Sequence, residues 1–256
     1  MSLLNQVVPF LRDSANWSGT FGIPHRIEEH LQYIGIALAI SLVIALPLGL
    51  LIGHTGRGAF LAINIGNAAR SLPTLGLLTL VVLVVGLGLT PVLVALVVLA
   101  VPPILTSTYA GIRAVDPAVI DAGRGMGMSG LRVLRQIELP LALPLMLGGL
   151  RSAVLQVVAT ATIAAYVALG GLGRFLIDGL ANRDYPQMVA GALLVAGLAI
   201  VLDLVLLGVQ RLVVSPGISG RLGTSASTTA GTTASTAVPA DAAVLLTRDR
   251  PANAPT

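Results

Sequence analysis

The chain has 256 residues, of which 55% are hydrophobic and only 10% are charged, and its formal net charge is +4. Soluble domains carry about 25% charged residues, so this composition excludes an ordinary soluble domain and predicts a polytopic membrane protein. All 15 basic residues are arginines scattered along the chain, and cysteine is absent, which excludes a clustered nucleic-acid interface, disulfides, thiolate metal sites and cysteine nucleophiles.

Five apolar segments follow a mixed N-terminal segment, residues 1–30, which we expect to lie outside the membrane or at its surface. Its last residues, 27–30, are typical of an amphipathic helix leading into the first span. The first uncharged run, 31–53, is long enough as a helix to cross a bilayer core of about 30 Å. The other expected spans occupy residues 59–86, 92–112, 139–167 and 188–212, with polar loops at 113–138 and 170–186.

Together these spans make a transmembrane domain, residues 31–215. Gly49 and Gly53 form a small-residue pair in its first span, which would let a neighbouring helix approach closely. Residues 216–256 are rich in Ser, Thr, Ala and Gly and lack the apolar surface that offsets the entropy of ordering. We therefore predict a disordered cytoplasmic tail.

The arginines also predict an orientation, because cytoplasmic segments of membrane proteins are enriched in basic residues near the span ends. With the N-terminus outside, five spans place the loop 113–138 and the tail in the cytoplasm. The basic residues then divide unequally between the two sides: Arg57, Arg113, Arg124, Arg132, Arg135, Arg211 and Arg221 inside, and Arg12, Arg26, Arg174 and Arg183 outside. This excess favours a cytoplasmic location for the loop 113–138.

That loop carries the most informative pattern in the chain. Asp121-Ala122-Gly123 is followed by Gly127, six residues after Asp121. Ile137-Glu138-Leu139-Pro140 begins ten residues after Gly127. A polar segment of this kind, held between two membrane spans on a basic loop, is suited to docking a soluble partner.

The same loop contains clear signals for local structure. Asp116-Pro117 predicts a helix start, because Asp accepts a capping hydrogen bond and Pro is favoured at the first helical position. Gly125 and Gly127 weaken this helix, since an interior glycine costs about 1 kcal/mol relative to alanine. Ser129 can cap a second helix, in which apolar residues recur at three-residue intervals from Leu131 to Ile137.

The spacing resembles the "EAA" loop of permease subunits in binding-protein-dependent ABC importers, with Asp121 in place of Glu and Gly123 in place of the second Ala. The resemblance implies an all-α polytopic membrane protein with about five transmembrane helices and the type I ABC importer permease (MetI-like) fold. In that family the loop docks on the ATPase subunit. The resemblance therefore assigns coupling, within residues 113–140, to Asp121, Ala122, Gly123, Gly127, Ile137, Leu139 and Pro140.

Three stretches resemble the osmoprotectant branch of these permeases, namely residues 70–76, 121–129 and Gly170-Gly171-Leu172-Gly173. This branch imports glycine betaine, choline, carnitine or proline betaine. The resemblance implies a permease that forms the translocation path for a quaternary-amine osmoprotectant and is not itself an enzyme. It implies no cofactor on this chain, because ATP and Mg are bound by the partner subunit. An ABC permease for small amino acids such as methionine is the nearer alternative, and an ATP-independent secondary carrier is the more distant one.

The resemblance also implies the partners: ABC ATPase subunits, a second permease copy in a homodimer or heterodimer, and an extracytoplasmic substrate-binding protein, at a bacterial cell membrane. No nucleic acid is expected as a partner. Substrate selection is expected mainly in the binding protein, where an aromatic cage can hold a quaternary ammonium group by cation–π attraction. The four Phe, four Tyr and one Trp of this chain do not form such a cluster in the sequence.

Five residues of the expected spans are candidates for the translocation path: Arg70, Ser71, Pro73, Arg151 and Asp203. Arg70, near Ser71 and Pro73, is costly in a bilayer and should face protein or water. It either lines the path or pairs with Asp203 of the last span. Arg151 in the fourth span raises the same question. No metal site or catalytic set is expected, because the three histidines are too scattered and no Ser/His/Asp arrangement can be argued.

Overall fold

The computed structural model describes residues 3–60, 64, 71 and 73–214. The chain divides into two units, Met1–Val214 and Ser215–Thr256, and all the described residues belong to the first. The predicted tail, 216–256, lies outside the described residues. Within the part of the chain that is described, every regular element is a helix, as the apolar runs predict.

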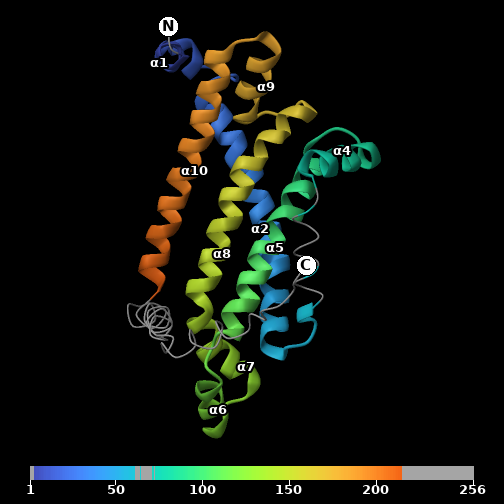
Figure 1. Cartoon of the computed structure of the whole chain (residues 1–256), viewed down its shortest axis with the longest axis vertical. Helices are drawn as coiled ribbons and strands as arrows, with labels where there is room; N and C mark the ends of the chain where they lie inside the picture. Colours follow the sequence, from blue (N-terminus) through green and yellow to red (C-terminus); the bar gives the residue numbers. More distant parts are fainter. Residues whose placement is uncertain (1–2, 61–63, 65–70, 72, 215–256) are drawn as a thin grey trace, which may run out of the picture. The chain divides into compact units, whose positions relative to one another are not determined.

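Four helical stretches are long and apolar enough to cross a membrane: Ile23–Thr55, Leu89–Arg113, Gly130–Val167 and Tyr185–Val213. They contain the long helices α2 (Ile23–Thr55), α5 (Leu89–Arg113), α8 (Leu139–Thr160) and α10 (Tyr185–Val213), which run lengthwise beside one another (Figure 1). The second expected span, 59–86, appears as the shorter apolar helix α4 (Thr74–Val85), and most of residues 61–72 lie outside the described part. An all-helical, multi-spanning fold is confirmed.

The observed ends of α5 and α10 lie within three residues of the predicted ones. In contrast, α2 begins at Ile23, so the predicted lead-in at 27–30 belongs to the same continuous helix as the first span. The N-terminal segment before it contains α1 (Leu3–Arg12) and the short helix η1 (Ser14–Trp17).

The segment 170–186 was predicted as a polar loop, and this prediction is wrong because it contains helix α9 (Gly173–Asn182). The helix is short and amphipathic, so its apolar face is easily missed in a polar stretch. Its Phe175 is buried with Ile23 and Leu172 in a small apolar cluster. Burial of that one face supplies the stabilisation that a helix of this length lacks on its own.

Glycines allow α5 to lie very close to both α2 and α8. A Cβ atom added to Gly49 would lie 2.7 Å from Cβ of Thr108, and one added to Gly53 would lie 2.7 Å from Cβ of Ile112. The predicted close approach at these two glycines of α2 is therefore confirmed. On the other side of α5, a Cβ added to Gly149 of α8 would collide with Ser107. This packing fixes α2, α5 and α8 against one another.

Helix α10 is attached to this group mainly through α8 and α9. The structure describes all of α10, and no residue in the most apolar stretch of this helix is buried within the chain. Its outward side chains are apolar, among them Ile200, Leu204 and Leu212. Such a surface is suited to lipid or to a second membrane subunit.

Candidate functional site

Helices α6 (Pro117–Gly125) and α7 (Gly130–Val133) lie beyond one end of the long helices, between α5 and α8 in the chain (Figure 1). We call residues 117–133 the coupling element, after the role that the sequence predicts for this loop. The predicted start of α6 is confirmed: Oδ1 of Asp116 accepts a hydrogen bond from the backbone N–H of Ala118 at 2.9 Å, and Pro117 is in the first turn.

Gly127 forms the turn between α6 and α7. Its φ of +81° is in the left-handed region, where an L residue with a side chain is strained. Backbone bonds from Gly127 N–H to Arg124 O at 2.9 Å and from Met128 N–H to Gly123 O at 3.2 Å close the end of α6. The turn is therefore a defined hydrogen-bonded structure that requires glycine at one position.

Ser129 occupies the capping position of α7, as predicted, but its side chain makes no capping hydrogen bond. Helical backbone does not end at Val133, the last residue of α7. It continues through a π-helical turn, η2 (Leu134–Glu138), directly into α8. A π-turn directly before Pro140 is understandable, because proline has no N–H and its ring crowds the carbonyl four residues earlier. The coupling element is thus joined to the fourth span by unbroken helix.

The two halves of the motif contact each other. Gly123 is buried, and a Cβ added to it would lie 2.5 Å from Cδ1 of Ile137. Glycine at this position therefore makes room for the isoleucine of the second half. Asp121 and Ala122 are exposed. Oδ1 of Asp121 forms a long ion pair with Nη1 of Arg124, at 3.9 Å. Asp121 and Ala122 therefore lie on the outer surface of α6, whereas Gly123 holds α6 onto η2.

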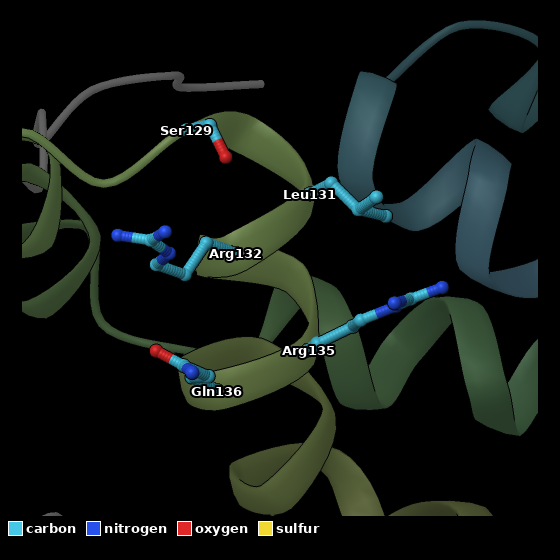
Figure 2. A pocket seen from close by; sticks show the side chains of 5 residues that line it. All are labelled: Ser129, Leu131, Arg132, Arg135 and Gln136. Carbon is cyan, nitrogen blue, oxygen red and sulfur yellow. The ribbon is translucent and has the colours of Figure 1, made fainter.

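Leu139 and Pro140, the last motif residues, are half-buried in the first turn of α8. A pocket of about 270 Å³ lies on α7 and η2 and is lined by Ser129, Leu131, Arg132, Arg135 and Gln136. Figure 2 shows that Arg132 and Gln136 point to one side of the helix, whereas Leu131 and Arg135 point to the other. This surface combines two arginines with an exposed leucine.

His54 and Glu138 form a contact that sequence reasoning missed. His54 Nδ1 of α2 lies 2.6 Å from Glu138 Oε2, and the Glu138 side chain is only 4% exposed. The two residues are 84 positions apart, so neither periodicity nor motif spacing relates them. The sequence did contain one indication of this contact. Glu138 is a carboxylate within an apolar pattern at the start of the fourth span, and a buried carboxylate needs a hydrogen-bonding partner.

Arg151 and Asp203 pair between α8 and α10. Nε of Arg151 donates to Oδ1 of Asp203, and Nη2 donates to Oδ2, each at 2.9 Å. The sequence suggested Arg70 as a partner for Asp203, but the partner in the structure is Arg151, and Arg70 lies outside the described residues. Ser71 and Pro73 are exposed, and Pro73 directly precedes α4. The structure therefore brings together two of the five predicted path residues.

Near its N-terminal end, α2 contacts the glycine-rich segment that follows the fourth span. Glu29 accepts hydrogen bonds from the backbone N–H of Gly171 and from Arg26, each at 2.8 Å. A Cβ added to Gly170 would collide with the same carboxylate. No role for Glu29 was predicted from the sequence, yet it joins the first span to the glycine-rich segment that follows the fourth. The glycines of that segment are explained by this close approach.

Three phenylalanines from separate parts of the sequence lie around one pocket. Phe10, Phe21 and Phe175 line a pocket of about 400 Å³ at this end of the molecule. These three residues lie closer together than their positions in the sequence indicate. The guanidinium of Arg26 already lies 5.4 Å from the centre of the Phe21 ring, so that ring has a cation–π partner within the chain.

The chain is similar to a known protein family and to several known transport proteins. Residues 45–216 match the family model described as "Binding-protein-dependent transport system inner membrane component". The glycine betaine/carnitine/choline transport system permease protein OpuCB of Bacillus subtilis is 33% identical over 85% of this chain and 98% of its own. The osmoprotectant import permease protein OsmW of Salmonella typhimurium is 34% identical over 74% of this chain and 91% of its own.

Two inward-facing crystal forms of the MetNI methionine ABC transporter have similar folds. One gives a TM-score of 0.63 at 25% identity over 73% of this chain and 94% of that chain. The other gives 0.65 at 22% identity over 75% and 96%. The MetI-like fold is confirmed, and partner ATPase and binding-protein subunits follow from the family. The chain belongs to the inner membrane components of binding-protein-dependent transport systems, and is the multi-pass permease subunit of an ABC importer whose ATP is bound by a separate ATPase.

Proposed function

We propose that the chain forms the translocation path for a quaternary-amine osmoprotectant, such as glycine betaine, carnitine or choline, handed over by an extracytoplasmic binding protein. The observation that carries this proposal is the 33% identity to a permease for these compounds over 85% of the chain and 98% of that relative. Methionine is the second candidate, since the solved transporter of similar fold carries it. Its identity of 25% is lower, so we rank it second.

The coupling element is proposed to dock on the ATPase subunit. Asp121 and Ala122 are exposed on α6, and two large apolar side chains beside them, Met126 and Leu131, are 76% and 58% exposed. Exposed apolar side chains among charged ones are typical of a surface that contacts another protein. Burial of Gly123 against Ile137 supports the role, because a stiff element transmits movement better than a loose loop.

The proposed assembly contains a second permease and has the N-terminus outside. The apolar outward face of α10 fits a membrane neighbour, and the arginine excess near the coupling element favours its cytoplasmic location. Lipid covers the remaining apolar surface in this arrangement. Substrate recognition remains mainly with the binding protein, because Arg26 already occupies the face of the exposed Phe21 ring.

Uptake of labelled glycine betaine, carnitine, choline and methionine tests the substrate proposal in cells with and without the gene, at low and high osmolarity. We expect uptake of at least one quaternary amine to depend on the gene and to be stronger at high osmolarity. Gene-dependent uptake of methionine alone would replace the proposal with the second candidate. Uptake that persists when no ATPase subunit co-purifies with the chain would favour a secondary carrier.

A further inference from the structure

His54, in the last turn of α2, lies between the end of η2 and the start of α7, which is the second helix of the coupling element. Its Nδ1 is 2.6 Å from Oε2 of Glu138, the last residue of η2. Its Nε2 faces the start of α7, because a Cβ added to Gly130 would lie 3.4 Å from this atom. The imidazole ring therefore contacts η2 on one side and borders α7 on the other.

The α2 side of this contact is firmly held. Gly53, next to His54, approaches Ile112 of α5 so closely that an added Cβ would lie 2.7 Å from the Ile112 Cβ. Ile112 is itself buried. Close packing of this kind resists sliding, because any shift loses contacts or creates a clash. A force applied to His54 therefore acts on the α2–α5 pair as a unit.

The coupling element reaches the fourth span through η2, which directly follows α7. Helix α6 packs against α7 and η2, and Gly123 lies against Ile137 of η2. A cavity of about 190 Å³ separates part of α6 from the span ends, and its lining includes His54, Glu138, Asp121 and Arg124. Because this side of α6 borders a cavity instead of close-packed side chains of the spans, displacement of α6 is transmitted by its packing against η2, where Glu138 is located.

We propose that His54 and Glu138 are positioning residues that carry displacement of the coupling element to the first span. Movement of α6 shifts η2 and Glu138, and His54 follows because leaving a buried carboxylate without its hydrogen bond is costly. The π-helical turn is where such a shift is easily accommodated, since π-turns recur at functional sites in helices. The inference rests on the proposed docking role of the coupling element.

The test uses the complete complex in proteoliposomes, with ATPase subunits and binding protein, and measures substrate imported per ATP hydrolysed. His54→Leu fills the space of the ring but removes the hydrogen bond. We expect the import ratio to fall at least about tenfold, the lower limit for loss of one hydrogen bond to a charged group, while ATP hydrolysis stays within about twofold. A purely structural role would reduce the amount of assembled complex and leave the ratio unchanged.

A conservative variant and a neighbouring control sharpen this measurement. His54→Asn places an amide N–H near the position of Nδ1, so we expect it to keep most of the import ratio. Thr55→Val changes the next residue, whose Oγ1 donates to Leu51 O within α2 at 2.6 Å, and should leave the ratio unchanged. Combining His54→Leu with Glu138→Leu should cost no more than His54→Leu alone, because both remove the same contact.

A cross-link provides an independent measurement if His54→Leu does not assemble. The chain has no cysteine, so His54→Cys with Glu138→Cys supplies one unique pair for a short bismaleimide. We expect a low import ratio before cross-linking and a severalfold rise after it, because a covalent link replaces the lost contact. A cross-link that leaves the ratio low, or an unchanged ratio in His54→Leu, overturns the inference. Absence of ATP-driven uptake by the unmodified complex contradicts the proposed function instead.

Discussion

Gly125 and Gly127 are two residues apart in the coupling element, but only Gly127 has a left-handed backbone, with φ of +81°. Nothing lies within 4 Å of a Cβ added at either position. A side chain at Gly127 is therefore opposed by backbone strain alone. The two glycines form a matched pair for testing the turn between α6 and α7. The sequence identified Gly127 by motif spacing, and its physical requirement is now apparent.

Gly127→Ala is expected to lower ATP-driven uptake about fivefold, because an alanine in the left-handed region costs about 1 kcal/mol. Gly125→Ala should leave uptake unchanged or slightly raised, since alanine favours helix at that position. Uptake is measured per permease present in the membrane. Equal uptake in the two variants would show that the left-handed turn has no role in coupling.

Arg151 and Asp203 form a bidentate ion pair between α8 and α10, with both bonds at 2.9 Å. Removing one partner leaves an unpaired charge within a membrane span, at a cost of about 2.5 to 3.5 kcal/mol. We expect Arg151→Leu to reduce the amount of folded permease in the membrane by at least tenfold. Arg151→Leu combined with Asp203→Leu should recover most of it, because neither charge remains.

Membrane abundance of the two variants and of the unmodified permease, measured by immunoblot, checks this prediction. If the double variant is as scarce as Arg151→Leu, the loss arises from packing around the arginine stem and not from an unpaired carboxylate. The sequence could mark both residues as costly in a span. It could not pair them, because the choice among Arg70, Arg151 and other partners depends on how α8 and α10 rotate against each other.

At the scale of elements, the close contact of α2 with α5 depends on glycine. Gly49→Leu should push the helices apart, since Thr108 already lies 2.7 Å from the position of an added Cβ. We expect the melting temperature of the purified permease to fall by several degrees, as for other overpacking changes that cost about 1–3 kcal/mol. Gly35→Leu in the same helix is the control, because nothing lies within 4 Å of an added Cβ there. A similar loss in both variants would contradict the packing role of Gly49.

Long apolar helices were predictable, while the elements between them were predictable only in part. The runs that became α5 and α10 end at charged residues or proline, so their limits were visible in the sequence. Helix α9 was missed because its stability comes from burial of Phe175 against other elements. The π-turn η2 was also missed, because it reflects how α7 meets α8 at Pro140 and has no periodicity of its own. Fold class thus follows from composition, whereas these details follow from tertiary contacts.

At the scale of the whole molecule, the candidate site was predicted unevenly. The motif residues from Asp121 to Pro140 do lie together at one end of the spans, and Gly123 contacts Ile137 as the pattern's spacing allows. The pairing of His54 with Glu138 and of Glu29 with Gly171 was not predictable, since each joins residues far apart in the chain. The motif identified the kind of transporter, and the long-range contacts indicate how its parts are held together.

The central claim is that this chain is an ATP-coupled path for a quaternary amine. The most direct measurement is uptake of labelled glycine betaine, carnitine and choline by proteoliposomes that contain the permease, its ATPase subunits and its binding protein. We predict uptake of at least one of them with ATP, and none when ATP is replaced by a non-hydrolysable analogue or when the binding protein is omitted. Uptake that is equal with ATP and the analogue, or ATP-driven uptake restricted to methionine, would contradict the account.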